Sequence, residues 1–418
     1  MTAGMIQMQK QSMPRALRQG MLCTLAAACV WAGGALGAAP AAAAAGQPGQ
    51  WYLDAMGAAE MWKVTTGKGI TVAVVDTGVN ATTPSLRGQV VKGFDATEAA
   101  GTETDDYNGH GTTMAEMIAG TGKGGGLQGL APGAKIMPMR IANTEFQNEN
   151  KVNAQDSADA IRAAADSEAK IINVSFASEF STSQERAAVE YAHGKGKLIF
   201  AGAGNNARTG NKPQYPASYP DAIGVASADK KGTVAEHSQH GDNVDITAPG
   251  TDVPVWCDES FQKYCKGSGT SAATAIASAS AALVWSAHPD WTANQVLRAL
   301  IDTAGRSWAK GTRSNYLGHG LIRPAQIVVD KKGDPGAPDI SPLTNQKTGA
   351  SPAASASPSA PASSQQPKGN AEGDTAVTGS SKKAEKKDSS NTGLIIGGVA
   401  AVVVLAGGAF FFLRRRTA

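Results

Sequence analysis

Residues 266–285 read KGSGTSAATAIASASAALVW. Almost every residue of this run is small, so its side chains alone could form little core. The run therefore predicts a buried helix whose backbone packs closely against its neighbours. The glycines before Ser271 allow a tight turn where that helix begins. A purely structural helix would explain the small residues, but not the Gly-Ser-Gly-Thr sequence that leads into Ser271.

Short runs rich in β-branched residues alternate with helical patterns through the middle of the chain. The expected strands are residues 70–76, 135–141, 170–176, 197–204, 222–229 and 244–250. Helical patterns between them include residues 156–169 and 183–196. This alternation predicts an α/β fold, a doubly wound and mostly parallel sheet with helices on both faces. Functional side chains are expected at the carboxyl ends of such strands.

Three stretches place a reactive side chain at the end or start of an expected element. VAVVDTGVN puts Asp76 at the end of the first strand, DYNGHGTT puts His110 between two glycines, and GSGTSAATA carries Ser271. Each alone is weak, because an Asp that ends a strand is often a cap and Gly-His-Gly can be a turn. Together they predict a catalytic set in the order Asp, His, Ser.

The chemistry requires this set of side chains. A serine hydroxyl is a poor nucleophile until a base takes its proton, and an imidazole titrates near neutral pH. Asp76 would hold the other ring nitrogen of His110 and stabilise the imidazolium. Asn205, in FAGAGNNA just beyond a strand, is placed to donate to the oxyanion beside the backbone N–H of Ser271.

These motifs resemble those of the subtilisin family of serine proteases. DTGVN, NGHGTTMA, NVSF, AGAGNN and GSGTSAA occur in the family's order across roughly residues 50–325. The resemblance implies a subtilisin-like fold with a single catalytic domain. The export and anchor signals described below, with QWYLDAMGAAEMW at residues 50–62, further resemble the mycosins, which are subtilisin-like proteases attached to type VII secretion systems of actinobacteria.

The resemblance also implies two walls of a pocket for P1, the substrate residue before the scissile bond. The residues carried over to these walls are Ser175, Phe176, Ala177, Ser178, Ala203 and Gly204. Ala177 and Ser178 stand where the family has two glycines, so we expect a narrowed pocket that favours small P1 side chains. The alternative is that these two side chains point away from the pocket. Ala272-Ala273-Thr274-Ala275 also replaces the usual Met-Ala-x-Pro after the nucleophile.

The cysteines fit an exported protein. Cys23 and Cys29 would leave with a signal peptide, whereas Cys257 and Cys265 remain close together in the expected domain. A disulfide between Cys257 and Cys265 is the natural interpretation for an exported chain, and two free buried thiols are the alternative.

The N-terminus has the pattern of a secretory signal. Lys10, Arg15 and Arg18 precede an apolar run and then a stretch of small residues. We expect a signal peptide at residues 1–45, a first transmembrane helix being the alternative. The peptidase domain would follow at residues 46–328.

The C-terminal part has the composition of a stalk and an anchor. Residues 329–391 are rich in Pro, Ala and Ser, which predicts a disordered stalk. Residues 392–413 would form a transmembrane helix rather than a buried core helix, because Arg414, Arg415 and Arg416 follow at once in the basic tail, residues 414–418. Basic residues stay in the cytoplasm, so the sequence predicts a single-pass protein of the cell membrane with its catalytic domain outside.

Composition limits the other functions. A formal net charge of only +3 and the lack of a basic, aromatic patch argue against nucleic acid as a partner. No carboxylate cluster is dedicated to a metal, so we expect no cofactor, although family members often carry calcium. The predicted function is a serine endopeptidase that acts on polypeptides and processes secreted proteins of a type VII secretion system. The alternatives are a docking component of that membrane complex and a nonspecific degradative protease.

Overall fold

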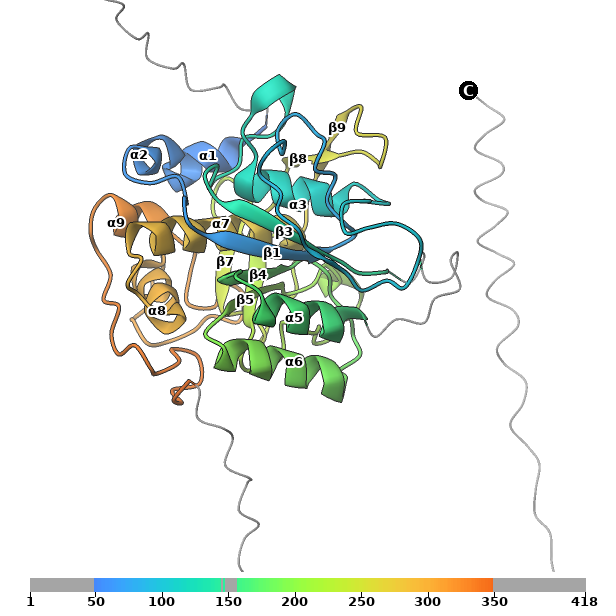
Figure 1. The fold of residues 1–418 in the computed structure, drawn as a ribbon. Helices are drawn as coiled ribbons and strands as arrows, with labels where there is room; N and C mark the ends of the chain where they lie inside the picture. Colours follow the sequence, from blue (N-terminus) through green and yellow to red (C-terminus); the bar gives the residue numbers. More distant parts are fainter. Residues whose placement is uncertain (1–48, 144–145, 147–155, 349–418) are drawn as a thin grey trace, which may run out of the picture. The chain divides into compact units, whose positions relative to one another are not determined.

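The computed structural model describes residues 49–143, 146 and 156–348. Seven strands form one parallel sheet in the order β2-β3-β1-β4-β5-β6-β7 (Figure 1). Their bounds are β1 Thr71–Asp76, β2 Phe94–Asp95, β3 Lys135–Arg140, β4 Ile171–Val174, β5 Leu198–Gly202, β6 Ile223–Ala228 and β7 Ile246–Pro249. The predicted parallel sheet is confirmed, and each of the six expected runs contains one of these strands.

The sequence reasoning missed three strands, β2, β8 and β9. β2 has only two residues, too few for a recognisable pattern. A separate antiparallel hairpin joins β8 (Val253–Trp256) to β9 (Tyr264–Gly267). β9 (Tyr-Cys-Lys-Gly) has no apolar run, and the four apolar residues of β8 include a proline, so neither has the run rich in β-branched residues by which the buried parallel strands were recognised.

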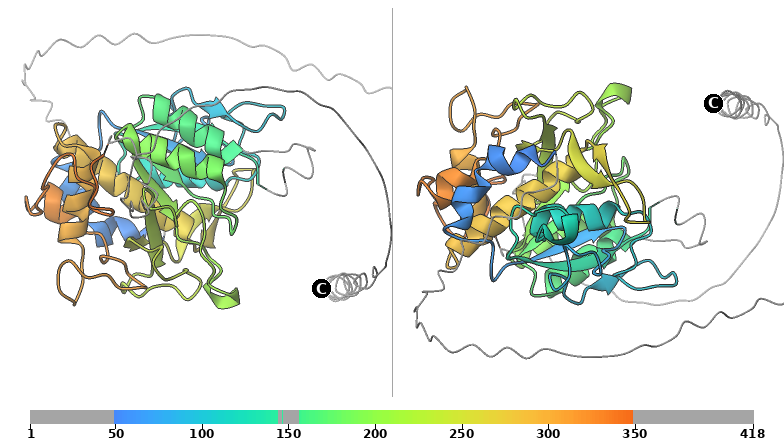
Figure 2. Two further views of the ribbon diagram at one scale, coloured as in Figure 1. Left: turned by 90° about the horizontal axis from the view of Figure 1, so that it is seen from below. Right: turned by 90° about the horizontal axis from the view of Figure 1, so that it is seen from above.

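Helices cover both faces of the sheet, as Figure 2 shows from two opposite sides. The longer helices are α3 (His110–Ala119), α5 (Asp156–Asp166), α6 (Ser183–Gly194), α7 (Thr270–Ala287) and α8 (Ala293–Thr303). The short ones are α1 (Trp51–Met56), α2 (Ala58–Trp62) and α9 (Pro324–Val328), and single 3₁₀ turns lie at Lys123–Gly125 and Ala207–Thr209.

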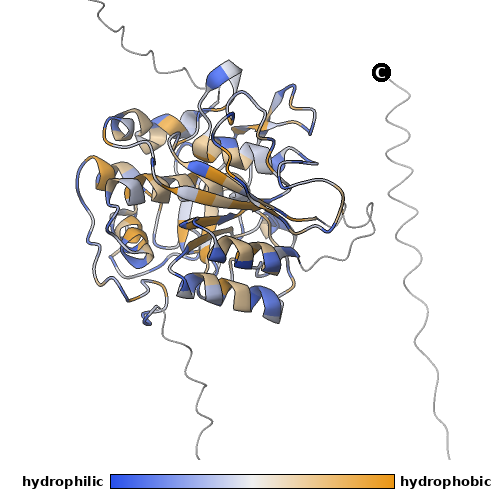
Figure 3. Cartoon of the chain, in the orientation of Figure 1, coloured by the Kyte–Doolittle hydropathy of each residue, from blue (hydrophilic) through white to orange (hydrophobic). Residues whose placement is uncertain are grey.

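Successive residues of each strand enter two different cores, since side chains alternate across a strand. In β1, Val72 and Val74 face the core shared with α3 and α7, whereas Ala73 and Val75 face the core shared with α5 and α6. Because both faces are covered, the strands are mostly apolar. The outer helices α5 and α6 carry both apolar and polar residues (Figure 3).

Helix α7 confirms the interpretation of the small-residue run. Nearly all of its residues are buried, and it packs against β4, β5, β6 and β7 as well as α3. Its buried hydroxyls are satisfied: Thr274 and Ser280 donate to carbonyl oxygens one turn earlier, and Ser278 donates to Asn173 Oδ1 in β4. A helix of larger side chains could not lie so close to the sheet.

The folded part extends further than the composition predicts. Residues 331–348, expected in the stalk, lie against α8, where Asn294 Nδ2 donates to the Pro338 carbonyl and Arg298 Nη2 donates to that of Ile340. Ser341 is buried. The packed part of the structure therefore continues past residue 328, the expected end of the domain, because side chains of α8 bond to this polar, proline-containing segment.

The predicted signal peptide, the rest of the predicted stalk, the predicted anchor and the basic tail lie outside the described residues. Within residues 49–143, 146 and 156–348, the structure contains no helix with the length and apolar character needed to cross a membrane.

Candidate active site

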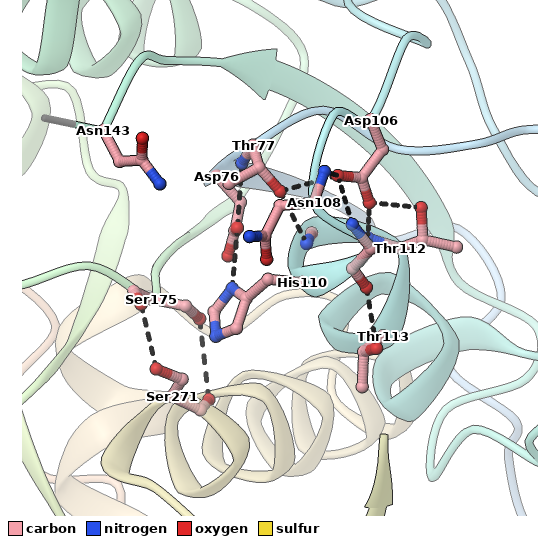
Figure 4. Close-up of polar contacts among 12 residues, drawn as sticks. Asp76, Thr77, Asp106, Asn108, His110, Thr112, Thr113, Asn143, Ser175 and Ser271 are labelled. Carbon is pink, nitrogen blue, oxygen red and sulfur yellow. Dashed lines mark hydrogen bonds and ion pairs between the residues drawn. The ribbon is translucent and has the colours of Figure 1, made fainter. Parts of the chain in front are cut away.

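The structure brings Asp76, His110 and Ser271 to one edge of the sheet (Figure 4). Asp76 is the last residue of β1, His110 is the first residue of α3, and Ser271 lies in the first turn of α7. The Nδ1 atom of His110 lies 2.7 Å from Oδ1 of Asp76. The Asp76 carboxylate is buried and also accepts a hydrogen bond from the backbone N–H of Thr77.

His110 is held by the way α3 begins. Both oxygens of the buried Asp106 carboxylate accept hydrogen bonds around this turn, Oδ1 from Gly109 N and Oδ2 from the backbone N–H and hydroxyl of Thr112. Oδ1 also accepts from Thr77 Oγ1, which in turn accepts from Gly111 N. Asp106 thus ties the start of α3 to the end of β1, where Asp76 lies.

A glycine is required directly after His110. A Cβ atom at Gly111 would lie 2.1 Å from the carbonyl oxygen of Gly78. Any larger residue would push α3 away from the turn after β1 and lengthen the Asp76–His110 contact. The Gly-His-Gly sequence therefore allows a close approach of two backbones.

The ring of His110 titrates above its usual range. Burial acts against the charged ring, but the Asp76 carboxylate outweighs burial through its charge and its hydrogen bond, and Asp106 adds to it, so the pKa of His110 is raised. The side chain is still 36% exposed, so its second ring nitrogen remains accessible. This nitrogen points toward Ser271 and Ser175 in Figure 4.

Ser271 is hydrogen-bonded to the segment that follows β4, which the resemblance predicts as one wall of the substrate pocket. Its hydroxyl donates to the carbonyl oxygen of Ser175 at 2.9 Å. Ser175 is held in turn by the buried Asn173, whose Nδ2 lies 2.7 Å from Ser175 Oγ. The nucleophile candidate, its helix and this wall therefore form one hydrogen-bonded unit.

Asn205 lies beside Ser271 with a fixed orientation. Its Oδ1 accepts hydrogen bonds from the backbone N–H of Thr270 at 2.9 Å and from the Thr270 hydroxyl at 3.1 Å. These two bonds to Oδ1 fix the orientation of the amide. Its donor group, Nδ2, remains available for another acceptor. The first backbone N–H groups of α7 lie at the same place, as expected for an anion site at a helix start.

A pocket of about 150 Å³ opens next to Ser271, and we call it the P1 pocket. It is lined by Ser175, Phe176, Ala177, Gly202, Asn205, Asn206, Gln214, Thr270 and Ser271. Three of the residues predicted for its walls therefore line it. Ser178, Ala203 and Gly204 lie outside this lining: Ser178 pairs through its backbone with Tyr215, and Ala203 packs against Ala226 and Val244.

A cleft of about 520 Å³ lies on the other side of Ser271. His110, Asn205 and Ser271 all border it, and its far wall is the β8–β9 hairpin with Trp256 and Asp258. Ser271 and Asn205 thus lie between two adjoining hollows.

Residues 67–320 match the sequence profile of Peptidase S8, the subtilase family. The chain belongs to the subtilase family. Thermitase from Thermoactinomyces vulgaris is 35% identical to it over 268 residues, which cover 62% of this chain and 91% of thermitase. The predicted membership and the predicted serine endopeptidase activity of this subtilase are confirmed.

Solved structures of similar fold include two proteases of secretion systems. The serine protease MycP1, described as an essential component of the type VII (ESX-1) secretion system, has a TM-score of 0.57 and 28% identity to the subtilase, covering 70% of this chain and 90% of MycP1. The MycP3 protease from the type VII (ESX-3) secretion system has a TM-score of 0.56 and 28% identity, covering 67% and 88%. The resemblance to mycosins is therefore confirmed.

The hairpin that walls the larger cleft is fixed to α3 of the subtilase. Cys257 and Cys265 are joined in a disulfide, as the export signals predicted. Beneath it, the hydroxyl of Tyr264 donates to the buried carboxyl group of Glu116 at 2.6 Å, and the backbone N–H of Trp256 donates to Thr113 Oγ1. Burial raises the pKa of Glu116 to about 7, more than its hydrogen bonds lower it.

Sequence reasoning missed several residues of this site. Asp106 could have been found, because an Asp just before a helix start commonly accepts backbone N–H bonds. Gln214 and Glu116 gave no signal, since one lies in a loop and the other looks like an ordinary polar position of α3. In the part of the chain that the structure describes, no group of three or more His, Cys, Asp or Glu residues could hold a metal ion.

Proposed function

We propose that this subtilase is a membrane-anchored, extracellular endopeptidase that cuts polypeptides with Asp76, His110 and Ser271. The observation that carries the proposal is the contact of 2.7 Å between Asp76 and His110, next to Ser271 at the meeting point of the P1 pocket and the larger cleft. A base that is oriented by a buried carboxylate and lies beside a serine hydroxyl is the arrangement that acyl transfer needs.

Acylation begins when the Ser271 hydroxyl leaves the Ser175 carbonyl and turns toward His110. The Nε2 atom of His110 takes the hydroxyl proton while Ser271 Oγ attacks the carbonyl carbon of the scissile bond. The negative oxygen that forms accepts hydrogen bonds from Asn205 Nδ2 and from the Ser271 backbone N–H. The imidazolium then gives its proton to the amide nitrogen, the C–N bond breaks, and the amine fragment leaves an acyl-enzyme.

Deacylation reverses these roles with water. His110 takes a proton from water, and the resulting oxygen nucleophile attacks the ester carbon of the acyl-enzyme. The same two donors hold the second oxyanion, and the proton returns to Ser271 Oγ as the acid product forms. Asp76 stays ionised throughout and stabilises the positive charge of the ring.

A covalent label tests this assignment directly. A fluorophosphonate reacts only with an activated serine, so the purified protein should be labelled on Ser271. His110→Ala should label far more slowly, whereas Lys266→Ala, a change on the exposed edge of the hairpin, should label like the wild type. Labelling that is equal in wild type and Ser271→Ala would overturn the assignment.

The location outside the cell rests on the two ends of the chain. The basic and apolar N-terminal pattern and Arg414, Arg415 and Arg416 after an uncharged run both favour an external domain. Protease treatment of intact cells stripped of their wall should release the domain by cutting the stalk. Complete protection under conditions where the domain is cut after lysis would contradict this location.

A second function is favoured by the similarity to MycP1 and MycP3, which are described as parts of type VII secretion systems. In this proposal the domain also serves as a docking component of such a complex, and proteolysis processes the secreted proteins. Secretion should be compared in a deletion strain, in that strain with the wild-type gene, and in that strain with Ser271→Ala. Restored secretion with Ser271→Ala assigns the docking role, and failure to restore it assigns the role to proteolysis.

A further inference from the structure

The P1 pocket contains one long polar side chain that no catalytic role explains. Gln214 lies in the loop before the Tyr215–Pro216 bond, and it is 2% exposed. It is part of the pocket lining together with Ala177 and Ser271. Of the other polar residues in the lining, Ser175, Asn205, Thr270 and Ser271 belong to the candidate catalytic site or contact it, and Asn206 is exposed, so Gln214 is the buried polar side chain of this pocket that has no such role.

The backbone of this loop is fixed against the first wall of the pocket. Tyr215 N donates to the carbonyl oxygen of Ser178 at 2.8 Å, and Ser178 N donates to that of Tyr215 at 3.0 Å. The carbonyl oxygen of Gln214 accepts bonds from the backbone N–H and the hydroxyl of Ser218. Ser178 therefore holds the loop that carries Gln214, and does not itself narrow the pocket.

The second wall keeps the Gln214 side chain from moving back. A Cβ atom at Gly204 would lie 2.6 Å from Gln214 Cγ and 1.7 Å from Oε1 of Gln239. The buried side chain of Gln239 thus fills the space behind Gly204, and its Nε2 donates to the carbonyl oxygen of Lys212. Gln214 Nε2 donates a long hydrogen bond of 3.4 Å to the same carbonyl oxygen, which leaves the second N–H and the Oε1 acceptor of its amide for a group in the pocket.

We propose that Gln214 determines the P1 preference of this subtilase, which is a short side chain, and best a short polar one such as Ser, Thr or Asn. This inference rests on the proposed peptidase function. A polar P1 group can bond to the Gln214 amide, whereas an aromatic ring would both collide with the side chain and bury its amide without a partner. Ala is accepted because it does not reach the amide.

Two variants separate size from polarity. Substrate peptides that differ only in P1, with Ala, Asn or Phe, are compared by kcat/KM. The wild type should favour Ala and Asn over Phe by about tenfold or more. Gln214→Gly should reduce that preference by about tenfold, chiefly through faster cleavage after Phe. Gln214→Met, which keeps the length but removes the amide, should lose the advantage of Asn over Ala and still reject Phe.

Gln239→Ala is the matched control. It removes a buried glutamine that bonds to the same carbonyl oxygen, but lies behind Gly204 and outside the lining. It should lower the melting temperature and leave the ratio of Phe to Ala cleavage within about twofold of the wild type. A change in that ratio as large as the one for Gln214→Gly would mean that general loosening of the walls sets the preference, and would overturn the assignment.

A binding measurement separates this proposal from the peptidase function. In the Ser271→Ala background, labelled peptides that end in Ala, Asn or Phe occupy the P1 pocket as products, and their affinities are read by fluorescence anisotropy. Gln214→Gly in this background should raise the affinity for the Phe peptide relative to the Ala peptide. If Gln214→Gly changes neither the relative affinities nor the kcat/KM ratios, the role of Gln214 is overturned. If these affinities shift but the wild-type protein does not react with fluorophosphonate, only the peptidase proposal is overturned.

Discussion

The hydroxyl of Ser271 donates its hydrogen bond to the carbonyl oxygen of Ser175, 2.9 Å away. Nδ1 of His110 lies 2.7 Å from Oδ1 of Asp76, so in the proposed mechanism the Ser271 hydroxyl must leave the Ser175 carbonyl before it can give its proton to His110. Because Ser175 also lines the P1 pocket, a bound substrate and the resting hydroxyl share the same wall.

Ser271→Ala, His110→Ala and the double variant should lose peptidase activity by similar large factors. The two side chains act as one unit, so the losses should not add. The folded domain should remain, since Ser271→Ala removes one hydrogen bond worth about 1 kcal/mol. The measurement is kcat/KM on one peptide, with the melting temperature as the control. A double variant whose loss equals the product of the single losses would mean that the residues act separately.

Activity should depend on pH through His110. Protonated His110 cannot accept the Ser271 proton, so kcat/KM should rise with pH through an apparent pKa above 6.5, the direction set by Asp76. Asp76→Asn should move this limb to lower pH and lower kcat by about 10⁴, because it removes the charge and favours the wrong tautomer. If Asp76→Asn leaves the apparent pKa of this rise unchanged, the rise belongs to the titration of another group.

Asn205→Ala should lower kcat by about 10²–10³ with little change in KM, the range known for the oxyanion-hole asparagine of subtilisin. Thr270→Val tests the orientation of the amide, because it removes the hydroxyl bond to Asn205 Oδ1 but keeps the backbone one. We expect an intermediate loss of kcat for Thr270→Val. A kcat unchanged in Asn205→Ala would mean that the backbone donors suffice.

Glu116 should make the fold less stable at higher pH. Its pKa is raised from 4.5 to about 7, so the folded chain holds a proton that the unfolded chain releases from about pH 4.5 upward. The free energy of unfolding therefore falls by up to about 3 kcal/mol as the pH rises toward 7, and it stays level above pH 7. Urea unfolding of wild type and Glu116→Gln at pH 5 and pH 8 isolates this contribution. If the free energies of unfolding of wild type and Glu116→Gln differ by the same amount at pH 5 and pH 8, the titration of Glu116 does not affect stability.

Loss of the disulfide should lower the stability of the fold more than it lowers the reactivity of Ser271. Cys257 and Cys265 are eight positions apart, and closing so short a loop contributes about 2–3 kcal/mol on a chain-entropy account. The Cys257→Ser/Cys265→Ser variant should therefore melt at a lower temperature, yet still react with fluorophosphonate on Ser271. Two alkylatable thiols in the non-reduced wild-type protein would show that the bond does not form in solution.

The sequence by itself determined the sheet and the order of the reacting groups. Continuous apolar runs that alternate with helical patterns are typical of strands buried on both faces, so six of the seven strands of the parallel sheet were predictable. Asp76, His110 and Ser271 could be singled out as candidates because each lies within two residues of a glycine where a strand ends or a helix begins. Local sequence carries such information, since turns, caps and close backbone approaches depend on residues a few positions apart.

Only the tertiary structure decided what surrounds those groups. Gln214 enters the P1 pocket because Ser178 and Tyr215 pair across the chain, and Ser178 is drawn out of the pocket by the same pairing. The pKa of Glu116 is raised to about 7 because burial, to which the β8–β9 hairpin contributes, disfavours its charged form. Residues 331–348 pack against the domain because side chains of α8 donate hydrogen bonds to them. Burial, pocket shape and pKa depend on contacts between residues far apart in the chain, and no local pattern records those contacts.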